Sequence, residues 1–180
     1  MVHHLITDRL LLRPYKRTDA CRVQALAGER EVAETTLAIP HPYPVEAAES
    51  WIESHAKLIE NGEAYPFAMV LRDDNWLIGT MTIRVDHQHN KGELAYWVGK
   101  DYWGQGYATE AAKRITQFGF DELTLNRVFA QAMSRNKGST KVMEKVGMSY
   151  EGTLKQELFH WGKYEDVDVY GLLRSAYDQQ

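Results

Sequence analysis

The stretch that decides the fold is Tyr96–Ile115, "YWVGKDYWGQGYATEAAKRI". Its start continues a strand-like run, "GELAYWVG", and its end begins a helical pattern with Ala111, Ala112 and Ile115 on one face. A glycine-containing loop lies between the two. The first turn of a helix carries backbone N–H groups without an intrahelical partner, and the helix dipole adds partial positive charge there. The stretch therefore predicts a strand–loop–helix unit that binds an anion.

The glycines of this loop are compatible with phosphate binding, because Gly104 and Gly106 allow a close backbone approach and a positive φ. A P-loop is excluded, since the loop has no lysine for a γ-phosphate and no Ser or Thr placed for magnesium. A dinucleotide site of the Rossmann type would need a third glycine, where Thr109 is found, and an acidic residue after the next strand. The pattern argues against kinase, ATPase and NAD-dependent chemistry.

The rest of the chain alternates strand-like and helical runs without a repeat or a linker. The expected strands are "RLLLRPY" (9–15), "YPFAMVL" (65–71), "WLIGTMTIRV" (76–85), "GELAYWVG" (92–99), "RVFAQAM" (127–133), "SYEGTLKQELFH" (149–160) and "YEDVDVYGLL" (164–173). The expected helices begin at Thr18-Asp19, in "HPYPVEAAESWIESHAKLI" (41–59), near Thr109 and in "NKGSTKVMEKVGM" (136–148). This order predicts a mixed α and β (α+β) fold with a largely antiparallel sheet.

Composition limits the class of protein. A chain of 180 residues with 44% hydrophobic residues is expected to form one domain over residues 1–180. The net charge of −4 and the lack of a basic block disfavour a nucleic-acid partner.

No apolar run reaches the roughly 20 residues of a membrane span, and the first residues lack signal-peptide features, so a cytoplasmic location is expected. Cys21 is the single cysteine and is expected to be buried; no cluster has zinc-binding spacing, so no metal is expected.

The glycine loop also resembles the coenzyme A loop of the GNAT acetyltransferases, whose pattern is Gln/Arg-x-x-Gly-x-Gly/Ala between a strand and a helix. "WGQGYA" (103–108) matches it at Gly106 and Ala108 and departs from it at Trp103. The longer string "YWGQGYATEA" is similar to the bacterial ribosomal-protein N-terminal alanine acetyltransferases. Four further segments occur in the family's order: "TDRLLLRPY", "IGTMTIR", "NKGSTKVMEKVGM" and "EGTLKQE…GKYEDVDVYGLL". The resemblance implies a sheet of six to seven strands, flanked by helices and splayed at the coenzyme A loop.

The resemblance also implies acetyl-CoA as co-substrate. Its pyrophosphate would lie on the backbone amides of Gly104 to Thr109, and its pantetheine arm would pair with the end of the preceding strand, where a backbone N–H near Val98 can point at the thioester oxygen. The residues implied for coenzyme A binding are Trp97, Val98, Gly99, Trp103, Gly104, Gln105, Gly106, Tyr107, Ala108, Thr109, Asn136, Ser139 and Lys141.

Acetyl transfer to an amine needs a neutral amine, a polarised carbonyl and a proton for the departing thiolate. Glu93 is the first candidate for general base and Glu157 is its rival, with a water chain or desolvation of the amine as alternatives. Many family members protonate the thiolate with a tyrosine at the position of Met143, which cannot donate a proton. The ribosomal-protein branch uses a serine matched by Ser139, whose alternative role is N-capping of the following helix.

The sequence therefore favours an N-acetyltransferase that works by direct attack in a ternary complex. The expected acceptor is a protein N-terminal amine. A small amine such as a polyamine, an antibiotic or an amino-acid derivative is the first alternative, because the fold does not fix the acceptor. The others are a non-catalytic acyl-CoA-binding module and a protein-interaction domain. A homodimer is possible by resemblance; no membrane partner is expected.

Overall fold

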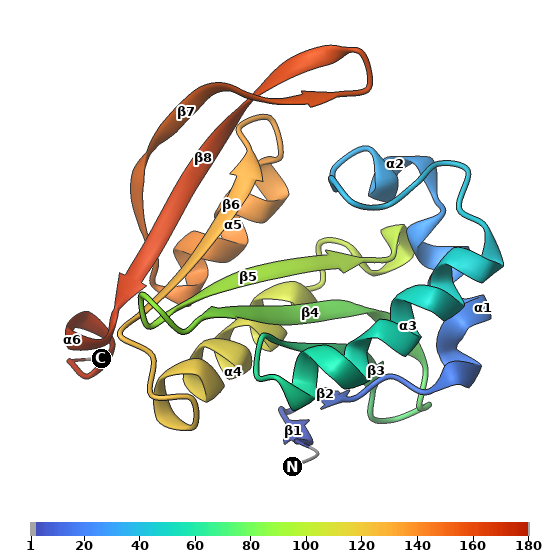
Figure 1. Cartoon of the computed structure of the whole chain (residues 1–180), viewed down its shortest axis with the longest axis horizontal. Helices are drawn as coiled ribbons and strands as arrows, with labels where there is room; N and C mark the ends of the chain where they lie inside the picture. Colours follow the sequence, from blue (N-terminus) through green and yellow to red (C-terminus); the bar gives the residue numbers. More distant parts are fainter. Residues whose placement is uncertain (1–2, 180) are drawn as a thin grey trace.

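The computed structural model describes residues 3–179 and contains an eight-stranded sheet in the order β1-β2-β3-β4-β5-β6-β8-β7 (Figure 1). The strands are β1 Leu5–Ile6, β2 Leu10–Arg13, β3 Ala64–Leu71, β4 Leu77–Asp86, β5 Lys91–Val98, β6 Arg127–Met133, β7 Ser149–His160 and β8 Lys163–Leu173. Strands β5 and β6 pair in parallel, and the other neighbouring pairs are antiparallel. The predicted α+β class and the mostly antiparallel sheet are confirmed.

Helices cover both faces of this sheet (Figure 1). They are α1 Ala20–Ala27, α2 Arg30–Ala33, α3 Val45–Glu60, α4 Tyr107–Asp121, α5 Lys137–Val146 and α6 Arg174–Tyr177, with 3-10 turns at Arg17–Asp19 and Lys100–Tyr102. One core cluster joins α4 and α5 to the sheet through residues such as Ile115 and Met143. A second joins α1 and α3 to the opposite face through Val23 and Ile52. Within residues 3–179, no helix has both the length and the apolar character for crossing a membrane.

Three details differ from the sequence-based expectation. The sheet has eight strands rather than six to seven, because Leu5–Ile6 forms a strand too short to leave a pattern of its own. Helix α4 begins at Tyr107, two residues earlier than expected, directly after the left-handed Gly106. The prediction that Cys21 is buried is wrong: Cys21 is exposed, since the buried stripe of α1 passes through Ala20 and Val23 and leaves Cys21 on the solvent side.

The sheet opens between β5 and β6. Their pairing runs from Lys91 opposite Arg127 to Leu94 opposite Ala130, whereas β5 continues to Val98 and β6 to Met133. Figure 1 shows β6 and the β7–β8 hairpin diverging from β4 and β5 beyond this point. The expected splay is confirmed, and it leaves polar groups at one edge of β5 without a strand partner.

Candidate active site

A cavity of about 1020 Å³ lies at this opening. At one end it is lined by Gly104 of the loop before α4 and by Tyr107 at the start of α4, and at the other by Trp51 and His55 of α3. We call these the loop end and the α3 end. The volume lies at the upper limit usual for ligand pockets. The cavity is large enough for a long ligand to occupy the loop end while a second molecule enters from the α3 end.

The loop end is formed mainly by backbone groups. Gly104 has φ 73° and Gly106 has φ 84°, both in the left-handed region that favours glycine. Within residues 3–179, no acceptor takes the backbone N–H of any residue from Gly104 to Thr109. A Cβ built on Gly104 would meet no atom within 4 Å, so the approach to this backbone is open. The loop thus presents a row of hydrogen-bond donors at the positive end of a helix.

Arg9, which the sequence did not single out, holds this loop from the side. Its Nε donates to Glu110 Oε2 at 2.7 Å, its Nη1 donates to the carbonyl oxygen of Gln105 at 3.0 Å, and its guanidinium lies 4.4 Å from the centre of the Tyr107 ring. Burial raises the pKa of Glu110, but hydrogen bonds from Thr7 and Arg9 more than offset it and hold that pKa below its ordinary value. Glu110 is therefore a structural anion, and it fixes the N-terminal turn of α4.

The free edge of β5 adds directed backbone groups in the middle of the cavity. The N–H of Gly99 donates to the carbonyl of Ile78 at 2.8 Å, and Val98 lies opposite Gly79. Backbone groups alternate along an antiparallel pair, so Tyr96 and Val98 direct theirs away from β4 and toward the splay. Trp103 Nε1 donates to the Val98 carbonyl oxygen at 2.7 Å, which leaves the Val98 N–H for a ligand.

The remaining residues predicted to bind coenzyme A divide into two groups. Trp97, Ala108, Thr109, Asn136, Ser139 and Lys141 line the cavity with those already described. Gly99 and Gln105 lie outside the lining found for the described chain. Gly99 is buried against Leu26, and the Gln105 side chain donates to the Asp101 carbonyl oxygen at 3.0 Å. Lys137, Lys141 and Lys145 recur every fourth residue on α5, and all three line the cavity.

The alternative role of Ser139, N-capping of α5, is wrong. Asn136 caps α5, because its side-chain oxygen accepts the N–H of Ser139 at 3.2 Å. The Ser139 hydroxyl instead lies 2.6 Å from the hydroxyl of Tyr96, a residue that the sequence reasoning missed. Burial raises the pKa of Tyr96 to about 12, although the hydrogen bond with Ser139 lowers it. Met143 is buried in the core.

Both predicted carboxylates line the cavity. Glu93 on β5 is half-buried, with its carboxylate 3.7 Å from the Arg84 guanidinium. Glu157 is exposed and lies in an irregular part of β7, where the register shifts between Leu154 and Leu158 and Gln156 adopts φ 52°. The Asp166 carboxylate accepts the Gln156 N–H at 2.9 Å and stabilises this bulge. The bulge brings Glu157 to the cavity wall.

Small residues on the sheet create the α3 end. Thr82 pairs with Pro66 and with Ala95, so the three side chains lie on one face of the sheet, opposite Trp51 and His55 of α3. His55 is buried, its Nδ1 has no hydrogen-bond partner within residues 3–179, and burial lowers its pKa to about 4. His55 is therefore neutral near neutral pH, and this part of the wall, formed with Trp51, Pro66, Thr82 and Ala95, carries no charge.

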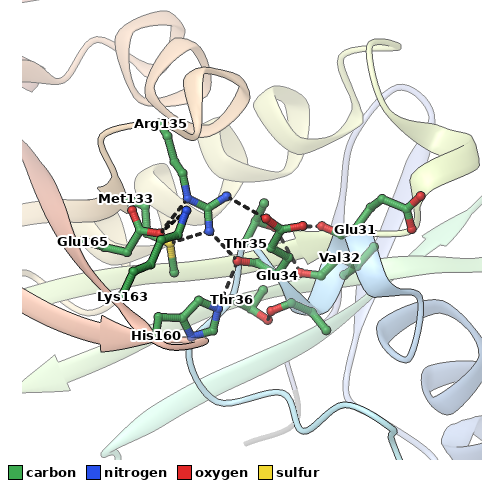
Figure 2. A network of polar contacts seen from close by, with 11 residues as sticks. Glu31, Val32, Glu34, Thr35, Thr36, Met133, Arg135, His160, Lys163 and Glu165 are labelled. Atoms are coloured by element: carbon green, nitrogen blue, oxygen red, sulfur yellow. Dashed lines mark hydrogen bonds and ion pairs between the residues drawn. The ribbon is translucent and has the colours of Figure 1, made fainter.

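A polar network that includes the cavity-lining Arg135 lies beside the cavity (Figure 2). Arg135, at the end of β6, donates to Glu165 on β8 at 2.9 Å and to the carbonyl oxygen of Glu34, after α2, at 3.1 Å. His160 Nε2 lies 3.0 Å from the same carbonyl oxygen. Three segments far apart in sequence are thereby joined, and the network holds the cavity-lining segment 35–40 beside the β7–β8 hairpin.

Comparison with known proteins gives this cavity a chemical context. The acetyltransferase (GNAT) domain family matches residues 9–149. A probable N-acetyltransferase of Bacillus subtilis, YjcK, is 31% identical over 178 residues, covering 94% of this chain and 97% of that protein. The putative ribosomal N-acetyltransferase YdaF of B. subtilis is 31% identical over 131 residues, covering 71% and 67%. The spermidine N(1)-acetyltransferase of Escherichia coli K12 is 28% identical over 157 residues, covering 87% and 81%.

Solved structures agree with the fold. A GNAT-family acetyltransferase from Bacillus anthracis superimposes with a TM-score of 0.86 at 25% identity, covering 96% of this chain and 99% of that one. Mycobacterium smegmatis RimJ, solved with a coenzyme A disulfide, superimposes with a TM-score of 0.84 at 24% identity, covering 97% and 87%. The family match spans more than half of the chain, so this protein belongs to the GNAT family and is an N-acetyltransferase.

Proposed function

We propose that this enzyme transfers an acetyl group from acetyl-CoA to the N-terminal amine of a protein, by direct attack within a ternary complex. The observation that carries the proposal is that one cavity joins the unpaired amides of the loop end to the α3 end, with the carboxylates Glu93 and Glu157 in its wall. Such a cavity suits two substrates that meet near the end of β5.

The loop end fits acetyl-CoA. The amides of Gly104 to Thr109 would bind the pyrophosphate, with Lys137, Lys141 and Lys145 adding positive charge along α5. Asn136 would contribute its amide NH2 group, because its side-chain oxygen already caps α5. The free edge of β5 would pair with the pantetheine arm, and the Val98 N–H would donate to the thioester oxygen as negative charge develops on it.

A carboxylate in the cavity wall would accept the amine proton, and Ser139 on α5 would stabilise the departing thiolate by a hydrogen bond. Glu157 is our first candidate for accepting the amine proton, since Glu93 shares its carboxylate with Arg84. Glu93, or a water held by either carboxylate, is the second candidate. The Ser139 hydroxyl would donate to the sulfur as the carbon–sulfur bond breaks. No covalent acetyl-enzyme is required.

The α3 end supports a peptide N-terminus over a polyamine. The acidic residues among the lining side chains of the described chain are Glu93 and Glu157, and Arg84 opposes Glu93. A polyamine carries further positive charges that this wall would leave without partners. A peptide that begins with a small, uncharged residue has one amine to place near the carboxylates. The similarity to YdaF, a putative ribosomal N-acetyltransferase, agrees with this choice.

A small amine is the second candidate acceptor, because the spermidine N(1)-acetyltransferase of E. coli aligns with 87% of this chain. The test is free-thiol release from acetyl-CoA with the purified protein, using peptides with N-terminal Ala, Ser or Met beside spermidine, amino acids and aminoglycosides. Release that depends on a peptide supports the proposal. Thiol release with spermidine alone would identify the acceptor as a polyamine. Tight coenzyme A binding without release from any amine favours a non-catalytic acyl-CoA-binding module.

A further inference from the structure

A pair of hydroxyl groups bridges the splay beside the free Val98 N–H. Tyr96 lies on β5, two residues beyond the last pair with β6, and Ser139 lies in the first turn of α5. Their hydroxyl oxygens are 2.6 Å apart. Both residues line the cavity with Val98. The pair thus connects the two elements between which the thioester of acetyl-CoA would lie.

The Tyr96 hydroxyl has two possible acceptors on Ser139. Its hydroxyl lies 3.2 Å from the Ser139 carbonyl oxygen and 2.6 Å from Ser139 Oγ. The phenol keeps its proton at neutral pH, as a tyrosine does at its ordinary pKa, and burial raises the pKa of Tyr96 further, to about 12. When Tyr96 donates to Oγ, the serine hydrogen must point to a different acceptor. The Asn136 cap holds the Ser139 backbone, so this hydrogen has a restricted set of directions.

We infer that Tyr96 is a positioning residue for acetyl transfer: by donating to Ser139 Oγ, it directs the serine hydrogen toward the sulfur of coenzyme A. The inference rests on the proposed function. As the carbon–sulfur bond breaks, its electron pair goes to sulfur, and the Ser139 hydroxyl stabilises that thiolate as a hydrogen-bond donor. The proton that finally neutralises the sulfur is the one lost by the acceptor amine, returned through solvent, so Ser139 and Tyr96 end the reaction unchanged.

The matched control is Tyr170, a buried tyrosine whose hydroxyl donates to Glu144 at 3.2 Å and which lies outside the cavity lining of the described chain. The variants are Tyr96→Phe, Ser139→Ala, the double variant and Tyr170→Phe. The first readout needs no acceptor: the thiol pKa of bound coenzyme A, from the ultraviolet absorbance of the thiolate across a pH series. The second is kcat, together with KM for acetyl-CoA and for the peptide.

Wild-type protein and Tyr170→Phe should lower the pKa of the bound thiol relative to free coenzyme A. Tyr96→Phe and Ser139→Ala should both return it toward the free value. Tyr96→Phe should lower kcat about ten-fold with little change in either KM, the usual scale for one directed hydrogen bond. The double variant should be no slower than Ser139→Ala, because Tyr96 acts through Ser139.

A Tyr96→Phe variant that binds coenzyme A and matches Tyr170→Phe in thiol pKa and kcat would overturn the inference and leave the proposed function intact. If the fold-losses in kcat of the two single variants multiply in the double variant, the inference is also overturned, since Tyr96 and Ser139 would then act independently. Failure of the wild-type protein to bind coenzyme A would instead remove the proposed function, and this inference with it. A fall in melting temperature for Tyr96→Phe alone, with unchanged thiol pKa, would assign Tyr96 to stability only.

Discussion

The two ends of the cavity are built from different materials. The loop end presents backbone amides from one continuous segment, Gly104 to Thr109, oriented by two left-handed glycines and a helix N-terminus. The α3 end is assembled from side chains of α3, β3, β4 and β5, with Glu157 brought in by a bulge in β7. Recognition by backbone amides depends little on side-chain identity, whereas the shape and charge of the α3 end depend on the side chains that line it. One end is therefore suited to a common donor and the other to a particular acceptor.

The largest effect is expected at Glu157, which we assign to proton transfer from the amine rather than to binding of coenzyme A. Glu157→Gln should lower kcat by about 10²- to 10⁴-fold, the range for loss of a general base. Affinity for coenzyme A should not change, because the loop end is built without this side chain. Initial rates and calorimetric titration check both statements. Glu93→Gln is the matched control; a larger loss in Glu93→Gln than in Glu157→Gln would exchange the two assignments.

The loop end should fail when its backbone conformation is disturbed. Gly106→Val places a β-branched residue at φ 84° and should weaken coenzyme A binding by about 30-fold or more, because the strain moves the amides of the loop. Gly162→Val is the control, since Gly162 has the same φ of 84° in the β7–β8 turn with no atom within 4 Å of an added Cβ. Equal affinities in the two variants would contradict a backbone-built site.

The α3 end contains a histidine whose protonation should destabilise the fold. The pKa of His55 is about 4 in the folded chain, against an ordinary value of 6.5. Between these values the unfolded chain binds the proton and the folded chain does not, so stability is lost as pH falls from 6.5 toward 4. At pH 5 the loss from His55 should be about 2 kcal/mol relative to pH 7. Urea unfolding of the wild type and of His55→Gln at both pH values measures this loss in the free energy of unfolding. An equal pH dependence in the two proteins would show that His55 does not contribute to the pH dependence of stability.

Filling the α3 end should affect the acceptor alone. Thr82→Leu adds bulk where Thr82 faces Trp51 and His55, and it should lower kcat/KM for the peptide by about ten-fold. Affinity for coenzyme A should stay at the wild-type value. Thr82→Val, which keeps the side-chain volume, is the control. If Thr82→Leu weakens coenzyme A binding as much as peptide use, the two ends are not separate.

The loop end could be predicted from the sequence because it depends on residues close together in the chain. Gly104 and Gly106 before an apolar helical stripe define the loop conformation, and the order of strands and helices defines the fold class. The brace from Arg9 could not be predicted, since it joins residues about a hundred positions apart. The contact between Tyr96 and Ser139 depends on where β5 and β6 separate.

Other features escaped prediction for local reasons. The bulge that carries Glu157 breaks the two-residue period of β7, so strand alternation gave no direction for that side chain. Ser139 was a plausible cap by residue type, but Asn136 is three residues nearer the start and takes the N–H of Ser139. Such errors arise where two residues of suitable type could fill one structural role, because the three-dimensional arrangement selects one of them.

The most direct test of acetyl transfer to a protein N-terminus is mass spectrometric location of the acetyl group. The substrate is a peptide with an N-terminal alanine and an internal lysine, incubated with acetyl-CoA and the wild-type protein, with the Glu157→Gln variant as control. The account predicts one acetyl group on the α-amine, formed much more slowly by the variant. Acetylation of the lysine side chain, or of added spermidine in preference to the peptide, would contradict it.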